Sequence, residues 1–113
     1  MTETMTSTAH VLTERPARYG KQLASHFGHK TPFTWDAEAG RGEGSFGNGL
    51  AAVTVTAVDD ALDLVVEAPA DEIERFEGVV GRHLVRFGAK DELICHWTRG
   101  DGSEGTEQRH DGE

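Results

Sequence analysis

The chain has 113 residues, one cysteine and a net charge of −9 with neutral histidines, which suits one domain with a modest hydrophobic core. Its hydrophobic content of 36%, with two Trp and five Phe, indicates that it folds. The acidic balance argues against binding to nucleic acid or to a membrane, because both require a basic surface. No run approaches the roughly 18 apolar residues of a membrane span, and Met1–Ala9 lacks a signal-peptide pattern. With one cysteine and no internal disulfide, we expect a cytoplasmic protein.

The N-terminal part of the chain predicts a short strand followed by a helix. His10–Leu12 is the strand. Thr13 then suits a helix N-cap and Pro16 is tolerated in the first turn, so the helix is expected to run to about Phe27 and to end at Gly28. The residues that share one face at helical spacing are Tyr19, Leu23, His26 and Phe27.

The middle of the chain predicts four strands joined by tight turns. Apolar and polar residues alternate there with the period of two that is typical of half-buried strands. Gly47-Asn48-Gly49 is a strong hairpin signal, and Asp59-Asp60 marks the next turn. The expected strands are Phe33–Ala37, Glu43–Phe46, Leu50–Val58 and Leu62–Glu67.

A second helix is predicted to open at Ala68–Glu72, where a proline at the first position and two acids in the first turn suit a helix N-terminus. Gly88 is expected to end this helix, and Leu93–Trp97 is the last predicted strand. The apolar stripe of the helix consists of Ile73, Phe76, Val80, Leu84 and Phe87.

Both ends of the chain are expected to lie outside this fold. Residues 1–8 are predicted to be a flexible N-terminus, and residues 100–113 a disordered, acidic, Gly-rich tail that contains no hydrophobic residue. Residues 9–99 then form one α+β domain, in which an antiparallel sheet is covered on one face by two amphipathic helices. The other face is either solvated or buried against a second copy, so a homodimer remains open.

Several motifs along the chain resemble those of a known bacterial family. They are Pro16–Leu23, His26, His29-Lys30, His83–Phe87, Glu92-Leu93 and Trp97. In this order and spacing they resemble the family catalogued as domain of unknown function 2218, over about Ala9–Arg99. The family has no established activity. The resemblance implies a link to iron and siderophore handling, because members are similar to domains associated with siderophore-interacting, flavin-dependent reductases, and such a reductase is the implied partner.

Three histidines are the candidate metal ligands. His26 and His29 lie three residues apart at the end of the first predicted helix, and His83 lies on the stripe of the second. If the helices pack side by side, the three imidazoles can converge on one ion, and imidazole suits both iron and zinc. Against this, Gly28 separates the first two, and no HExxH or CxxC motif is present. The alternative is that they are structural histidines that complete the core.

Two arginines of the second helix form a candidate ligand-binding pair. Arg82 and Arg86 are four residues apart, which places them on one face, where they can clamp a carboxylate or phosphate. A siderophore or a flavin phosphate has such groups. The alternative is a solvated helix face that complements the helix dipole.

Three functions remain open after these observations. The favoured one is a non-catalytic binding or accessory module in iron–siderophore handling. The second is a small metal-binding or acid–base enzyme that uses His26 or His83, and it requires an acid such as Asp36 or Glu92 beside the histidine. The third is a structural or oligomerising domain.

Cys95 is expected to be a buried, inert thiol, because the neighbouring His96 points to the opposite face of the same strand.

Overall fold

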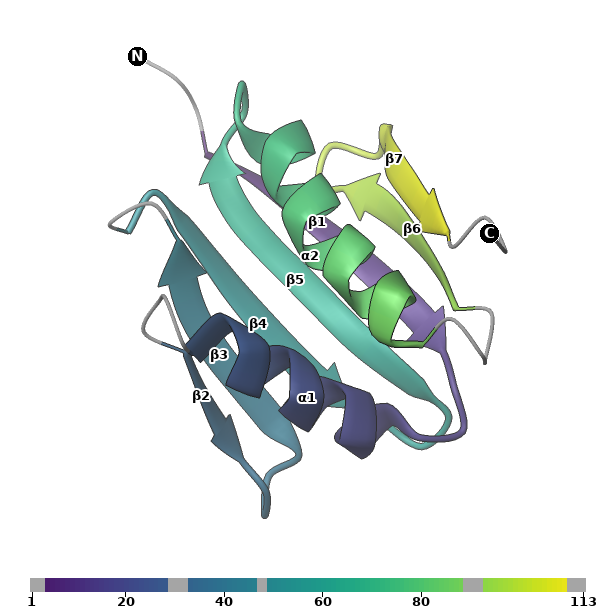
Figure 1. The fold of residues 1–113 in the computed structure, drawn as a ribbon. Coiled ribbons are helices and arrows are strands. Elements are labelled where there is room, and N and C mark those ends of the chain that lie inside the picture. Colours follow the sequence, from purple (N-terminus) through teal and green to yellow (C-terminus); the bar gives the residue numbers. More distant parts are fainter. Residues whose placement is uncertain (1–3, 29–32, 47–48, 89–92, 110–113) are drawn as a thin grey trace.

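The structure, a computed structural model, describes residues 4–28, 33–46, 49–88 and 93–109. Within these residues, seven strands form one antiparallel sheet, and two helices lie side by side across one of its faces (Figure 1). The elements in chain order are β1 (Thr4–Leu12), α1 (Pro16–Gly28), β2 (Phe33–Asp36), β3 (Arg41–Phe46), β4 (Ala51–Ala57), β5 (Ala61–Pro69), α2 (Ile73–Phe87), β6 (Ile94–Arg99) and β7 (Glu104–Arg109).

The first strand lies near the middle of the sheet, although it comes first along the chain. The strand order is β2-β3-β4-β5-β1-β6-β7, so β1 separates β5 from β6. β1 pairs with β5 along its whole length, from Thr4 opposite Pro69 to Leu12 opposite Ala61. The connection from β5 to β6 therefore has to cross β1, and α2 is that connection. α1 makes the other crossing, from β1 to the edge strand β2, and covers β2–β4 (Figure 1).

The core lies between the helix layer and the covered face of the sheet. Alternating residues of strands β1 to β6 point into it: on β4, Val53 and Val55 are buried whereas Ala52 is exposed. Each fully buried Leu or Val side chain contributes about 1.5–3 kcal/mol to the free energy of unfolding. The largest fully buried apolar side chains are Trp97, Leu23, Leu62, Leu64, Ile73 and Leu84. Neither helix in the described part of the chain is long and apolar enough to cross a membrane.

The close approach of α1 to the sheet depends on one glycine. A Cβ atom built on Gly20 would lie 2.7 Å from Cη2 of Trp35 and 3.2 Å from a methyl group of Leu62. Real Cβ atoms do not approach other carbons so closely, so a larger residue at this position would push α1 away from β2. The helix therefore packs on the indole ring itself.

The structure confirms the predicted α+β fold with its antiparallel sheet and two helices on one face. The Gly47-Asn48 turn lies outside the described residues. The start of α2 differs, because β5 continues through Pro69 and the helix begins only at Ile73. Thr4 opposite Pro69 is the last pair of the β1–β5 ladder, and this tertiary pairing keeps Pro69 in the strand.

Both predicted ends of the domain are corrected by the structure. Strand β1 begins at Thr4, within the segment expected to be flexible, because its backbone pairs with β5. In place of a wholly disordered tail, Glu104–Arg109 forms β7, which pairs with β6 and packs beside α2. A strand without hydrophobic residues is held here by its ladder and by a buried carboxylate of α2, and neither is visible in the composition of the tail.

Candidate functional site between the two helices

The structure brings together two of the three predicted histidines. The imidazole rings of His26, near the end of α1, and His83, on α2, lie with their centroids 4.8 Å apart and their planes at 41°. The two histidines are 57 positions apart in sequence, so this contact joins two helices that are distant along the chain. His29 lies outside the described residues. Within the described part of the chain, no group of three or more His, Cys, Asp or Glu side chains is placed to hold a metal ion.

An aromatic cluster supports this pair of histidines from the core side. The ring of Phe27 contacts the ring of His83 edge-on, with centroids 5.3 Å apart, and the ring of Phe87 contacts His26 in the same way at 5.4 Å. Phe27 also contacts Phe33 and Phe46. Packed rings of this kind hold their partners in a fixed orientation. The pair is therefore positioned by the core, while His26 is exposed and His83 is half-buried.

A backbone carbonyl fixes the protonation pattern of His83. Its Nδ1 lies 2.6 Å from the carbonyl oxygen of Val79, one helical turn earlier. A carbonyl oxygen only accepts hydrogen bonds, so Nδ1 must be the donor. Neutral His83 therefore has its lone pair on Nε2. This is the arrangement in which histidines bind metal ions, because the bond made by one nitrogen orients the other.

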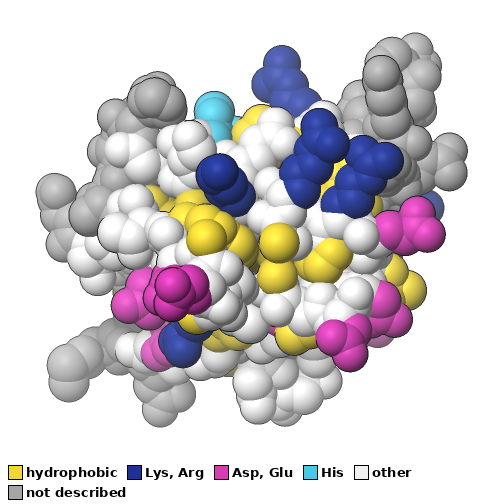
Figure 2. Space-filling view, turned by 90° about the horizontal axis from the view of Figure 1, so that it is seen from below, with side chains coloured by type: hydrophobic (Ala, Val, Ile, Leu, Met, Phe, Trp, Pro, Cys, Tyr) yellow, Lys and Arg dark blue, Asp and Glu magenta, His cyan; other side chains and the backbone are white. Residues whose placement is uncertain are grey.

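A groove runs along α1 beside these rings and carries positive charge. It has a volume of about 440 Å³ and is lined by Arg18, Lys21, Gln22, Ser25, His26 and Phe87. Two of these side chains are cationic and none is acidic, although the whole chain has a net charge of −9. Figure 2 shows most of the Lys and Arg side chains of that view in its upper part and most of the Asp and Glu side chains lower. The lining of this groove thus has the opposite sign to the net charge of the protein.

The predicted arginine pair does not belong to the lining of this groove. Arg82 and Arg86 are both exposed on α2. The guanidinium of Arg82 lies over Gly78, where a built Cβ would be 2.5 Å from Nη1. Arg86 follows His83 by three residues and is therefore its neighbour on the helix surface. The arginine clamp stays a prediction.

The acid required by the enzyme hypothesis is engaged elsewhere. Oδ1 of Asp36 accepts hydrogen bonds from the backbone N–H groups of Glu38 and Ala39, at 3.0 and 3.2 Å, and so stabilises the turn after β2. Glu92 lies outside the described residues.

Cys95 is fully buried, and burial, with a smaller effect of the Glu77 charge, raises the pKa of its thiol to about 12. It is therefore an inert core residue, as predicted.

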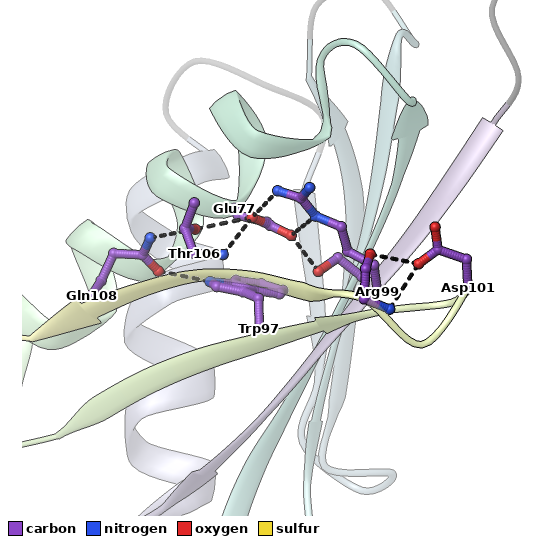
Figure 3. A network of polar contacts seen from close by, with 8 residues as sticks. Glu77, Trp97, Arg99, Asp101, Thr106 and Gln108 are labelled. Carbon is purple, nitrogen blue, oxygen red and sulfur yellow. Dashed lines mark hydrogen bonds and ion pairs between the residues drawn. The ribbon is translucent and has the colours of Figure 1, made fainter.

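The sequence does not by itself reveal a highly connected polar group among the described residues, the fully buried carboxylate of Glu77 on α2 (Figure 3). Ser7 on β1 donates a hydrogen bond to it at 2.6 Å. Arg99 on β6 donates two, each at 3.1 Å, from Nε and Nη2. Thr106 on β7 donates one from its backbone N–H at 3.0 Å and one from its hydroxyl at 2.9 Å. One carboxylate thus joins α2 to three strands.

The hydrogen bonds to Glu77 decide its ionisation. Burial alone raises the pKa of this carboxyl, but the bonds from Arg99, Ser7 and Thr106 outweigh burial and hold the pKa below its usual range. A signal for this role was present in the sequence. Glu77 follows Ile73 by four residues and precedes Val80 by three, so it lies on the apolar stripe of α2. A charged residue on such a stripe requires a partner, which here comes from β6 and β7.

Comparison with known proteins establishes the family. The chain matches the family described as "Uncharacterized protein conserved in bacteria (DUF2218)" over residues 8–98, and it belongs to that family. It is also similar to the NMR structure of PA4090 from Pseudomonas aeruginosa, at 27% sequence identity and a TM-score of 0.64. That similarity covers 88% of this chain and 98% of the other. A search of curated proteins gave no match.

Proposed function

We propose that this domain is a non-catalytic binding module whose groove along α1 holds an anionic metal chelate. The observation that supports the proposal is the lining of the groove, which is cationic and free of acids on a strongly acidic protein. Arg18 and Lys21 supply the charges that attract carboxylate or catecholate oxygens. Phe87 supplies an apolar wall, which suits the organic part of a chelate.

The histidine pair gives this groove a preference for a metal chelate over a plain anion. His26 lines the groove, and its ring contacts that of His83, whose Nε2 carries the lone pair in the neutral form. Nε2 can take a coordination position on iron that the chelator leaves to water. A chelated ferric ion therefore has two sources of affinity, one from its anionic shell and one from its metal. Iron is bound in this proposal as cargo.

The biological setting of the proposal follows from the family resemblance. A ferric siderophore is an anionic chelate of this class, and a siderophore-interacting flavin reductase is the proposed partner that would reduce the bound iron. We place the domain in the cytoplasm, where the unpaired Cys95 would stay reduced. The alternative of an acid–base enzyme has less support, because Asp36 is engaged in its own turn.

The proposal is tested by titrating the protein with gallium citrate, a diamagnetic substitute for ferric citrate, while recording ¹H–¹⁵N spectra. Shifts are expected in α1 and around His83. In Arg18→Ala/Lys21→Ala, the affinity should fall by about tenfold or more, because charge-assisted bonds contribute about 1.5–3 kcal/mol. The matched control is Arg41→Ala/Arg75→Ala, which removes the same charge from exposed positions away from the groove lining and should change the affinity less than about twofold.

Two further titrations separate the sources of affinity. Citrate without metal should bind more weakly than gallium citrate, and His83→Ala should remove that difference while leaving citrate binding intact. Inorganic phosphate binding as tightly as the chelate would show a general anion site and would overturn the metal part of the proposal. Equal loss of affinity in the two double variants, or shifts confined to other elements, would overturn the groove itself.

A further inference from the structure

The face of the sheet opposite the helices carries a second pair of histidines at one level of neighbouring strands. β1 and β6 pair antiparallel, with Thr8 opposite Thr98 and Ala9 opposite Trp97. Continuing this register by one residue beyond Ala9 and Trp97 places His96 opposite His10. Both side chains point away from the core, with exposed fractions of 57% for His10 and 45% for His96. Residues opposite each other on adjacent strands have Cβ atoms about 4.5–5.5 Å apart.

Each of these histidines is held from its outer side by a carboxylate. Nδ1 of His10 lies 2.5 Å from Oδ1 of Asp63 on β5, and Nδ1 of His96 lies 3.2 Å from Oε1 of Glu107 on β7. The strand order β5-β1-β6-β7 therefore gives the row Asp63, His10, His96, Glu107 across the open face. The two imidazoles are the inner members of this row.

The carboxylates determine which nitrogen of each ring carries the lone pair. A carboxylate accepts, so Nδ1 carries the proton in both rings and neutral His10 and His96 each have their lone pair on Nε2. Nε2 lies across the ring from Nδ1 and is therefore directed away from the carboxylate in both histidines. A histidine whose Nδ1–H is bound to a carboxylate is the usual form of a metal ligand, because the carboxylate orients the ring and raises its basicity.

We propose that His10 and His96 form a binding site for a divalent transition-metal ion, Zn²⁺, Ni²⁺ or Cu²⁺, on the open face of the sheet. The ion is bound by the two Nε2 atoms, at the usual bond length of about 2.0–2.1 Å for zinc, and water completes its coordination. Asp63 and Glu107 act as positioning residues. Two protein ligands form an open site of modest affinity, which leaves room for a further ligand from solvent or from another molecule. The proposal does not rest on the groove between the helices.

The test is calorimetric titration of the full, untagged chain with ZnCl₂, NiCl₂ and CuCl₂ in a buffer that does not bind metals. One ion per chain is expected for the wild type. His10→Ala and His96→Ala should each weaken binding by about tenfold or more, because each removes one of two ligands. Both side chains are exposed, so these variants should keep their fold, and His10→Gln provides a second variant of similar size. Asp63→Asn should weaken binding by about tenfold while leaving both ligands in place.

The matched control is Thr8→Ala/Thr98→Ala, which truncates the neighbouring exposed pair on the same two strands and should leave the affinity for the metal ion unchanged. A wild type that binds no metal would overturn the proposal. So would binding that persists in His10→Ala/His96→Ala, or an equal loss of binding in Thr8→Ala/Thr98→Ala. In ¹⁵N spectra, a zinc-induced shift should appear at Nε2 of His10 and His96 and be absent at Nδ1.

Discussion

The two helices are held on the same sheet by different chemistry. α1 packs on β2–β4 through apolar contacts: Gly20 lies against the ring of Trp35, and Phe27 enters an aromatic cluster. α2 has an apolar stripe as well, but its contact with β6 and β7 passes through the buried carboxylate of Glu77. Every residue of β7 is polar or glycine, so this strand has no apolar side chain with which to join the core.

The difference shows how a strand without hydrophobic residues becomes part of a domain. Taking a carboxylate and a guanidinium out of water is costly, and such pairs are poor general sources of stability. Their value here is geometric, because the two oxygens of Glu77 accept five hydrogen bonds from directions that only one arrangement of β1, β6 and β7 satisfies. Apolar contacts fix α1, and hydrogen-bond directions fix the position of β7 relative to α2.

The largest effect is expected from Glu77→Ala. The substitution leaves Arg99 without its partner and Ser7 and Thr106 without their acceptor, and removing one partner of a buried ion pair costs about 3–5 kcal/mol. Urea unfolding measures this loss. Glu74→Ala, an exposed position on the same helix, is the control and should change the free energy of unfolding by less than about 0.5 kcal/mol. A similar loss in both variants would refute the special role of Glu77.

A smaller effect is expected from Gly105→Ala, which tests the fit of β7 against α2. The new Cβ would lie 2.5 Å from Oε2 of Glu77 and 2.8 Å from Cβ of Trp97. Overpacking of this kind costs about 1–3 kcal/mol, and hydrogen exchange should speed up first in β7. Gly100→Ala meets nothing closer than 3.5 Å and serves as the control. Gly20→Ala should destabilise the domain to a similar extent without a selective effect on β7. Selective opening of β7 in that variant would contradict the view that β7 depends on its contact with α2 and not on the packing of α1.

The pH dependence of stability should give the smallest of the three effects. The pKa of Glu77 is lower in the folded state than in the unfolded chain, so its ionised form stabilises the fold. That contribution is complete above the ordinary glutamate pKa of about 4.3 and is lost as the pH falls through the depressed folded-state pKa. Urea unfolding of wild type and Glu77→Gln, from about pH 6 to about pH 3, should show a gap that narrows in acid. A gap of constant size would show that Glu77 is not ionised in the fold.

Much of the fold was predictable because local pattern and burial agree. The stripe from Ile73 to Leu84 is buried as the helical spacing requires, and Val53 and Val55 point into the core as the alternation on β4 requires. The ends were not predictable in this way. Residues Glu104–Arg109 have the composition of a disordered tail, and their pairing with β6 depends on a carboxylate 29 positions away from Thr106 in sequence.

The candidate site was predictable in its members and not in its surroundings. His26 and His83 could be named from their places on two helices, and the structure brings their rings into contact, whereas their role as metal ligands stays a prediction. The cationic groove depends on α1 lying beside α2, which brings Arg18 and Lys21 together with Phe87. The row from Asp63 to Glu107 could not be named at all, because it requires the order β5-β1-β6-β7, in which strands distant along the chain are neighbours.

The sequence by itself determined the family, the two helices and the faces that they bury, because these follow from motifs and from the spacing of apolar residues along a continuous segment. Only the tertiary structure decided where charges and imidazoles gather, because such groups come from segments whose neighbours are set by strand order. Glu77 illustrates this difference. Its position on the apolar stripe of α2 follows from the sequence, whereas its hydrogen bonds with Ser7, Arg99 and Thr106 form only when the sheet has folded.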